Sequence, residues 1–183
     1  MRVTGGAFRG RGLTVPAGAR PTEGRVREAL FSIWREPLER DGACRFLDLF
    51  AGSGVVGVEA AGRGALYVLC VDQDLGAVRA IAANAAQLGE KGVDHRRLAL
   101  PAGLARLAAE RAGPFDLAFA DPPYQFDAYE PLLVALHPLL AAGAEVAVEH
   151  ASRRDLPPIA GLLVRTGVRR YGESSLSFYR APE

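Results

Sequence analysis

Two short segments of the sequence carry residues whose types and spacing could do chemistry. The first is Asp48-Leu-Phe-Ala-Gly-Ser-Gly54, in which an acidic residue inside an apolar run is followed by a turn of small residues. Glycine has no side chain, so such a turn lets a ligand approach the backbone closely. The second is Asp121-Pro-Pro-Tyr124, which also follows an apolar run. We expect the first segment to hold a cofactor and the second to grip a substrate amine.

The Asp121 segment has the groups that an amino-group substrate needs. An exocyclic amine of a purine is a poor nucleophile because its lone pair is delocalised into the ring. The Asp121 carboxylate could accept one N–H and the Pro122 carbonyl the other, which would localise the lone pair for attack on a sulfonium methyl group. Pro122 and Pro123 fix φ and hold that carbonyl, and the Tyr124 ring can stack on the base. Catalysis would then rest on positioning and electrostatics, without a metal or a covalent nucleophile.

The glycine loop alone leaves two adenosine-bearing cofactors open. Gly52-Ser-Gly-Val-Val-Gly57 satisfies the GxGxxG pattern of dinucleotide binding, and Asp72 lies about 20 residues beyond its first glycine. Asp72 could accept hydrogen bonds from both ribose hydroxyls of either cofactor. Asp48, in contrast, would repel a pyrophosphate and suits a cationic or amine-bearing ligand. Together with the Asp121 segment, this favours S-adenosylmethionine over a nicotinamide dinucleotide.

These loops need elements that hold them at one edge of a sheet. Strand-like and helix-like segments alternate from residue 45 to residue 149, which favours a doubly wound parallel sheet with helices on both faces. In such a sheet, ligands bind beyond the carboxyl ends of the strands, and both loops follow a strand end. The expected strands are 45–50, 66–71, 95–98, 115–120 and 145–149, and the expected helices are 55–63, 75–88, 104–111 and 129–140.

The two ends of the chain depart from this alternation. Residues 162–170 and 176–180 have strand patterns with no room for a crossover helix between them, so we expect them to pair antiparallel. Glycines around Ala7-Phe8-Arg9 predict a β-hairpin in residues 2–15. Apolar residues at helical spacing predict a helix from Thr22 until Pro37 ends the pattern. The sequence thus predicts an α/β fold with a mostly parallel sheet, an antiparallel final strand, and an N-terminal hairpin and helix.

The composition and the net charge of the chain limit which partners it can be expected to bind. The 183 residues are 49% hydrophobic, which suits one compact core. The net charge is only +1, so the whole chain has no signature of polyanion binding. The first segment is nevertheless locally basic, and its arginines suggest contacts with phosphate groups.

The cysteines, histidines and apolar runs exclude several other classes of protein. Cys44 and Cys70 lie in or beside apolar runs without metal or redox spacing, so we expect buried thiols. His95, His137 and His150 form no ligand spacing, and no metal site is expected. No stretch reaches the roughly 20 apolar residues that span a bilayer, and no leader-like apolar region is visible. We therefore expect a cytoplasmic protein without membrane contact.

Beyond the two loops, the sequence resembles a known family from end to end. Asp48-to-Gly54 with Asp121-to-Tyr124 is similar to the seven-stranded class I methyltransferases that modify amino nitrogens. The flanking segments resemble the bacterial small-subunit ribosomal RNA guanine-N2 methyltransferases: Gly5-Gly-Ala-Phe-Arg-Gly-Arg11, Arg20-Pro-Thr22 with Arg25-Val-Arg-Glu-Ala-Leu-Phe31, and Tyr171-Gly-Glu-Ser-Ser-Leu-Ser-Phe-Tyr-Arg180. The resemblance implies a seven-stranded sheet, S-adenosylmethionine as methyl donor, and methylation of one guanine of 16S ribosomal RNA in an assembled or assembling small subunit.

The resemblance also implies roles for individual residues. It makes Asp48, Gly52 and Gly54 the cradle for the methionine part of the cofactor and Asp72 the acceptor for its ribose. The family usually has a polar residue for the adenine amine, but this chain has Pro101-Ala102, so adenine recognition would rest on backbone groups. The expected cofactor contacts are Asp48, Gly52, Ser53, Gly54, Asp72, Gln73, Arg20, Thr22 and Ala102. The expected catalytic residues are Asp121, Pro122, Pro123 and Tyr124, and the expected RNA-binding residues are Arg2, Arg9, Arg11 and Arg25.

Other functions compete with this interpretation. A DNA adenine-N6 or cytosine-N4 methyltransferase could use the same Asp121 segment, but 183 residues leave little room for a target-recognition region. Two further alternatives are a ribosome-assembly factor that binds S-adenosylmethionine without turnover and an NAD-dependent oxidoreductase. Neither would need the Asp121 segment, which is suited to binding an amine. We expect residues 1–40 to form a basic hairpin-and-helix extension packed on a methyltransferase domain of residues 41–183, in a monomer.

Overall fold

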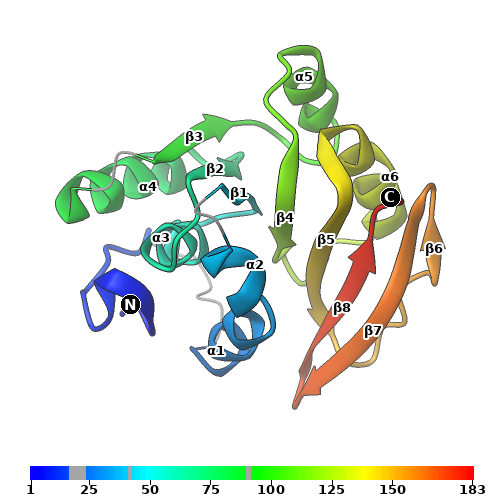
Figure 1. Ribbon diagram of the computed structural model, residues 1–183, viewed down its shortest axis with the longest axis horizontal. Helices are drawn as coiled ribbons and strands as arrows, with labels where there is room; N and C mark the ends of the chain where they lie inside the picture. The colour runs from blue at the N-terminus through cyan, green and yellow to red at the C-terminus, as the bar shows by residue number, and fades with distance from the viewer. Residues whose placement is uncertain (17–23, 41–42, 90–91) are drawn as a thin grey trace. The chain divides into compact units, whose positions relative to one another are not determined.

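The strand–helix alternation expected from the sequence is present in the computed structural model, which describes residues 1–16, 24–40, 43–89 and 92–183 (Figure 1). The chain divides into two units, Met1–Arg97 and Leu98–Glu183. This boundary differs from the one expected after residue 40, and the division into residues 1–40 and 41–183 stays a prediction.

Parallel strands form the sheet of the first unit. Its described residues contain β1 (Arg45–Leu49), β2 (Tyr67–Asp72) and β3 (Val93–Arg97), and β2 pairs in parallel with both β1 and β3. β1 and β2 are buried along most of their length, as expected for strands covered on both faces. Helices α3 (Val55–Gly62) and α4 (Leu75–Leu88) follow β1 and β2. Gly52 thus lies in the loop after β1, and Asp72 is the last residue of β2.

The N-terminal part of the first unit differs in detail from the prediction. A single antiparallel bridge joins Arg2 to Gly12, and the turn between them contains the 3-10 helix η1 (Gly6–Phe8), so the expected hairpin is present only as this short pairing. The helix predicted to end at Pro37 is divided at Trp34 into α1 (Gly24–Ile33) and α2 (Arg35–Glu39). Pro37 lies in the first turn of α2, where the missing N–H has no intrahelical partner to lose.

The second unit has the antiparallel ending that the sequence predicts. β4 (Phe115–Ala120) runs parallel to β5 (Leu140–Ala151), and β8 (Ser174–Arg180) pairs antiparallel with both β5 and β7 (Leu163–Tyr171). The two-residue β6 (Ile159–Ala160) pairs with β7 and is too short to give a sequence pattern. Helices α5 (Gly103–Ala109) and α6 (Tyr129–Leu136) complete this unit.

The predicted ends of both helices of the second unit were wrong. α5 ends at Ala109 instead of residue 111. α6 ends at Leu136 instead of residue 140, and the chain passes through the 3-10 helix η2 (His137–Leu139) directly into β5. Pro138 causes this early end, because its ring and its missing N–H prevent the continuation of an α-helix.

Aromatic side chains fill the interior of each unit. In the first unit, Trp34 packs edge-on against Phe46 with 5.9 Å between the ring centroids, and both are fully buried. In the second unit, Tyr179 is buried and its hydroxyl donates to the Pro157 carbonyl at 2.8 Å. Burial raises the pKa of Tyr179 to about 12, so the hydroxyl stays protonated as this hydrogen-bond donor.

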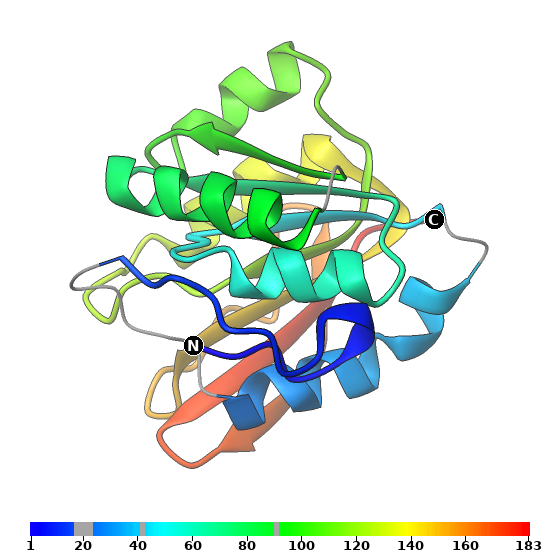
Figure 2. The ribbon, with the colours of Figure 1, turned by 90° about the vertical axis from the view of Figure 1, so that its left-hand side faces the viewer.

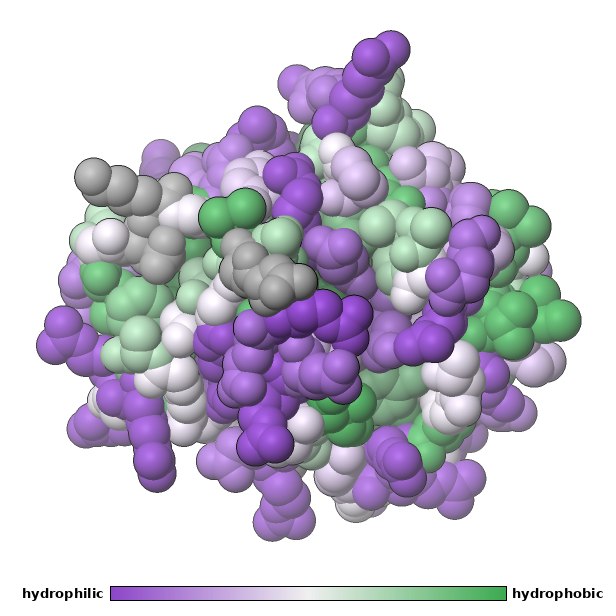
Figure 3. Space-filling model, viewed as in Figure 1, coloured by the Kyte–Doolittle hydropathy of each residue, from purple (hydrophilic) through white to green (hydrophobic). Residues whose placement is uncertain are grey.

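Apolar surface is exposed on part of the second unit. Large apolar side chains on and around β6, β7 and α6 are open to solvent, namely Val134, Ile159, Leu162 and Val164. Figure 3 shows apolar (green) surface at the side where Figure 1 draws β6. Within the described parts of the chain, no helix has both the length and the apolar character that a membrane span requires.

Candidate active site

The loop after β1 has the backbone shape that its glycines predict. Phe50, Gly52 and Gly54 have positive φ values of 58°, 55° and 73°. A Cβ added at Gly54 would lie 2.9 Å from Cγ1 of Ile81, so packing requires glycine there. A Cβ at Gly52 would meet no atom within 4 Å, which leaves the backbone open to a ligand. A positive φ at a bulky residue such as Phe50 is strained, and strain of this kind concentrates at functional sites.

Asp72 ties this loop to the end of β2. Its Oδ2 accepts a hydrogen bond from the backbone N–H of Gly52 at 2.9 Å, and its Oδ1 accepts one from the backbone N–H of Asp74 at 2.9 Å. Asp74, not Asp72, caps α4 by accepting the N–H of Ala77 at 2.8 Å. The partly exposed Asp72 carboxylate therefore lies beside the open backbone of Gly52. This arrangement fits the ribose of an adenosine-bearing cofactor. The neighbouring Gln73 side chain is exposed.

Asp48 is an internal residue of the first unit. It is 1% exposed, and its Oδ2 accepts the backbone N–H of Gly57, near the start of α3, at 2.9 Å. A carboxylate at this place also interacts favourably with the helix dipole. Burial, together with the nearby negative charge of Asp48, raises the pKa of the Cys70 thiol, and both cysteines are buried as expected. Asp48 thus fastens α3 to β1, and its contact with the cofactor stays a prediction.

Asn84, whose role the sequence pattern did not predict, supports the glycine loop through a hydrogen bond to Ser53. This α4 side chain is fully buried, and its Nδ2 donates to the carbonyl oxygens of Ser53 and Thr14, both at 2.9 Å. Its Oδ1 accepts the N–H of Thr14 at 2.9 Å. Asn84 therefore joins the loop to the N-terminal segment. The single asparagine of the alanine-rich α4 is the signal that could have identified it.

We expect Asn84→Ala to lower the free energy of unfolding by about 1–3 kcal/mol, because the buried Ser53 carbonyl loses its partner. Gln87→Ala is the matched control, since Gln87 reaches the same N-terminal segment from an exposed position and donates to Gly12 O at 3.3 Å. Its change should stay within about 0.5 kcal/mol. Urea denaturation of both variants measures the difference, and equal stabilities would show that Asn84 does not hold the loop.

Glu59 was also not expected from the sequence, and it anchors the N-terminal segment on α3. The side chain is fully buried and accepts hydrogen bonds from Thr4 Oγ1 at 2.6 Å and from Arg63 Nη2 at 2.7 Å. Figure 2 shows this segment running beside α3. Arg27 lies 3.8 Å from Glu59 and is itself buried, and burial lowers its pKa. One arginine of the basic segment is therefore internal and not available to phosphate.

The arginines expected to bind RNA differ from Arg27 in their exposure. Arg9 and Arg11 lie at the surface of the N-terminal segment, and Arg25 lies at the surface of α1. Arg2 is also exposed, and its Nη1 donates to Gly10 O at 3.0 Å. Their role in RNA binding stays a prediction. Arg20 and Thr22, which were expected to contact the cofactor, lie outside the described residues.

The Asp121 loop belongs to the second unit and begins directly after β4. Pro122 is buried and Asp121 is half-buried, whereas Tyr124 is 45% exposed. The N–H of Phe126 donates to Pro123 O at 2.8 Å, which closes the turn. The guanidinium of Arg153 lies 5.6 Å from the centroid of the Tyr124 ring. The turn thus exposes the aromatic ring of Tyr124 three residues after Asp121. The use of Asp121 and the Pro122 carbonyl as acceptors for an amine stays a prediction.

Ala102, expected to recognise adenine through backbone groups, is exposed at the start of α5. Next to it, Pro101 O accepts the N–H of Leu104 at 3.0 Å. The first unit thus holds the Gly52–Asp72 pair, and the second unit holds Ala102 and the Asp121 loop. The assignments of these residues to cofactor and substrate stay predictions.

Comparisons with known proteins agree with the fold. The family described as Conserved hypothetical protein 95 matches residues 1–180. The Bacillus subtilis (strain 168) protein YlbH is 34% identical over 186 residues, which cover 98% of each chain. Ribosomal RNA small subunit methyltransferase D of Escherichia coli (strain K12) is 34% identical over 163 residues, which cover 87% of this chain and 79% of the relative. A solved structure of a Thermus thermophilus protein is 35% identical with a TM-score of 0.83, and covers 100% of this chain and 99% of that one.

These similarities confirm the predicted α/β fold class with its mostly parallel sheet and antiparallel final strand. They extend along the chain, as the flanking motifs indicated. The chain therefore belongs to the Conserved hypothetical protein 95 family and is a relative of ribosomal RNA small subunit methyltransferase D, which confirms the family that the sequence resembles.

Proposed function

We propose that this protein transfers the methyl group of S-adenosylmethionine to the N2 amine of a guanine in 16S ribosomal RNA. The observation that carries the proposal is the Asp121-Pro-Pro-Tyr124 loop, with its exposed tyrosine ring directly after β4. The name of the Escherichia coli relative supports a ribosomal RNA substrate of the small subunit. The choice of guanine N2 rests on the motif resemblance of the N-terminal and C-terminal segments.

The first unit holds the cofactor in this proposal. The open backbone at Gly52 and the adjacent Asp72 carboxylate suit the ribose of S-adenosylmethionine. The buried carboxylate of Asp48 disfavours the pyrophosphate of a dinucleotide, so it argues against an NAD-dependent oxidoreductase. When bound, the cofactor supplies an electrophilic methyl group on a sulfonium. Gly52, Ser53, Gly54 and Gln73 complete the proposed contacts in this unit.

The second unit prepares the amine in this proposal. Asp121 accepts one N–H of the guanine amine and the Pro122 carbonyl accepts the other, so the nitrogen lone pair is localised toward the methyl group. The rigid ring of Pro123 keeps the turn in place, and Tyr124 stacks on the base. These residues thus act by orienting the guanine amine. A protein that bound S-adenosylmethionine without turnover would not need this loop.

Recognition of RNA rests on shape and phosphate contacts in this proposal. A folded ribosomal RNA presents its own shape to a small protein. The exposed Arg2, Arg9, Arg11 and Arg25 of the first unit would contact its phosphates. A double-stranded DNA substrate would instead require base flipping and the reading of flanking bases. The proposed partner is the cytoplasmic small ribosomal subunit or its assembly intermediate, bound by a monomer.

Tritium transfer tests the proposal directly. The full-length protein is incubated with labelled S-adenosylmethionine and small subunits that lack the modification, and the labelled nucleoside is identified by mass spectrometry. We expect label in N2-methylguanosine of 16S ribosomal RNA. Calorimetric titration should show binding of S-adenosylmethionine and none of NAD. Label in adenine or cytosine, or binding of NAD alone, would contradict the proposed reaction.

A further inference from the structure

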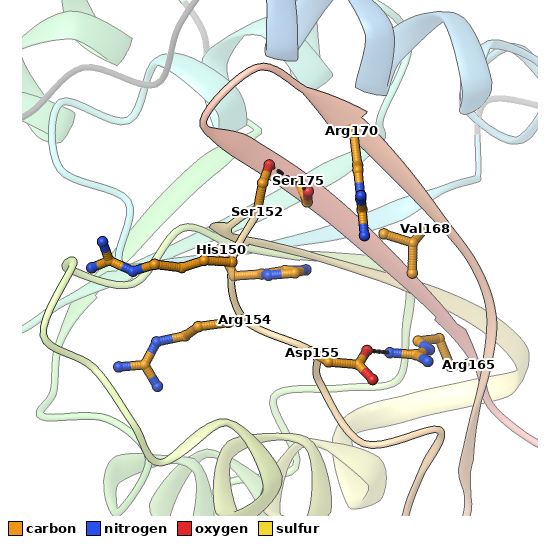
Figure 4. Close-up of a pocket in the computed structure, with 9 residues that line it drawn as sticks. His150, Ser152, Arg154, Asp155, Arg165, Val168, Arg170 and Ser175 are labelled. Atoms are coloured by element: carbon orange, nitrogen blue, oxygen red, sulfur yellow. Dashed lines mark hydrogen bonds and ion pairs between the residues drawn. The ribbon is translucent and has the colours of Figure 1, made fainter.

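Four arginines line one cavity of the second unit, which has a volume of about 490 Å³ (Figure 4). Arg153 and Arg154 come from the segment after β5, and Arg165 and Arg170 come from β7. Asp155 also lines it and forms a salt bridge with Arg165 at 2.7 Å. Within the described residues no salt bridge involves Arg153, Arg154 or Arg170, so the cavity carries a net positive charge.

The part of the cavity wall that β5 and β8 form is polar and uncharged. His150 Nε2 lies 2.8 Å from Ser177 Oγ, and burial lowers the pKa of His150, which keeps the ring neutral at pH 7. Ser152 Oγ lies 2.8 Å from Ser175 Oγ. Pockets for bases and other flat ligands are mostly apolar and aromatic, whereas here Val168 is the apolar contribution. Guanidinium groups, which can donate two parallel hydrogen bonds, together with hydroxyl groups instead suit the binding of a phosphate.

An irregularity of β7 gathers its arginines at one side of the strand. Successive side chains of a regular strand point to opposite faces, so residues 165 and 170 would lie on different faces. The pairing of β7 with β8 shifts between Arg165, opposite Tyr179, and Gly167, opposite Phe178. Such a bulge adds one residue and brings Arg165 to the face of Arg170. Asp155 and the Leu156 carbonyl then hold the Arg165 side chain in place.

Arg153 connects this cavity to the Asp121 loop. Ser152 and Arg153 line both this cavity and a neighbouring one of about 290 Å³ that includes Tyr124. The Arg153 guanidinium lies 5.6 Å from the Tyr124 ring centroid, which is within the range of a cation–π contact. Both cavities belong to the second unit. A nucleotide strand with a base on Tyr124 would therefore bring its backbone beside the arginines.

We propose that the pocket formed by Arg153, Arg154, Arg165 and Arg170 binds a phosphodiester group of the RNA strand next to the target base. We call it the arginine pocket. This inference rests on the proposed function, because it takes Tyr124 as the residue that stacks on the base. In this proposal the exposed Arg153 and Arg170 contact the phosphate. Arg165 lines the pocket in a fixed position, because its salt bridge with Asp155 holds the side chain.

Arg170→Gln tests the arginine pocket, with Arg169→Gln as its matched control. Both residues are exposed on β7 and lose the same charge, but adjacent strand residues point to opposite faces, and Arg169 does not line the cavity. We expect Arg170→Gln to weaken binding to small ribosomal subunits that lack the modification roughly tenfold, and to reduce the slope of log affinity against log salt by about one. Arg169→Gln should change neither. Filter binding over a salt series measures both quantities.

Turnover separates this inference from the proposed function. In tritium transfer, Arg170→Gln should raise KM for the RNA and leave kcat at saturating RNA unchanged. Arg153→Gln supplies a second variant, on the segment after β5 that also contacts the Tyr124 ring. Thermal melting and S-adenosylmethionine titration confirm that each variant is folded. Affinities and salt slopes equal to those of the Arg169→Gln control in both variants would overturn the arginine pocket, even with normal turnover. Absence of methyl transfer by the unaltered protein, with the affinity loss intact, would instead contradict the proposed function.

Discussion

Replacing Asp121 by alanine is expected to lower kcat for methyl transfer about 10²–10³-fold, because the target amine loses the acceptor that orients its lone pair. Asp121→Asn should lie between alanine and the unaltered protein, since the amide keeps one acceptor oxygen and loses the charge. Binding of S-adenosylmethionine should be unchanged in both variants. Tritium transfer at saturating RNA gives kcat, and calorimetric titration gives the cofactor affinity.

The control for Asp121 lies in the same loop. Asp127 is an exposed carboxylate between the Asp121 segment and α6, so Asp127→Ala removes an equal charge without removing the proposed acceptor. It should leave kcat unchanged. Undiminished transfer by Asp121→Ala would remove this residue from the mechanism. A parallel loss of cofactor affinity would show that Asp121 serves the cofactor or the fold, and not the amine.

Elements whose signals are local could be predicted from the sequence. α4 has the bounds 75–88 that the sequence predicts, and neighbouring residues set both of its ends: Asp74 accepts the N–H of Ala77 at the start, and Gly89 adopts a φ of 69° at the end. β4 was predicted at 115–120 from its mostly apolar run, which Asp116 alone interrupts. The glycine loop and the Asp121 loop are equally local, since their residue types alone indicate their chemistry.

Elements that depend on distant partners could not be predicted. The N-terminal segment folds around η1 because Thr4 binds Glu59, which lies 55 positions away in the sequence. Asn84 reaches Thr14 across 70 positions, so its role is invisible in its own helix pattern. Arg27 has the same residue type as its exposed neighbours and is distinguished only by its burial. The residue types of the loops therefore allow a prediction of their chemistry, which stays a prediction, whereas the residues that support the loops could not be predicted.

The arginine pocket illustrates the same limit for a site. Arg153 and Arg154 are separated from Arg165 by residues that include a two-residue strand, and the bulge that turns Arg165 toward Arg170 has no sequence signature. The basic segment at the N-terminus was the visible concentration of charge. The positive charge of the arginine pocket is gathered by strand pairing, so it is visible only in the folded second unit. There Ser175 of β8 lies opposite His150 of β5 and opposite Arg170 of β7.

Asp72→Ala is expected to weaken S-adenosylmethionine binding roughly 100-fold, which corresponds to about 2.7 kcal/mol. Two effects combine in this loss. The ribose hydroxyls lose a charged acceptor, and the N–H of Gly52 loses the carboxylate that fixes the glycine loop at 2.9 Å. Asp72→Asn should lose less, since one oxygen remains, although its amide cannot accept both the Gly52 and the Asp74 N–H groups. Calorimetric titration of each variant measures the affinity.

Asp74→Ala separates cofactor binding from the stability of α4. Asp74 lies two residues from Asp72 and caps the helix, so its removal should cost about 1 kcal/mol of folding free energy and leave the cofactor affinity nearly unchanged. Equal losses of affinity in Asp72→Ala and Asp74→Ala would mean that distortion of this turn, and not contact with ribose, explains the effect. A loss confined to Asp72→Ala would assign the effect to the Asp72 carboxylate, which bonds the N–H of Gly52 and is the proposed acceptor for the ribose.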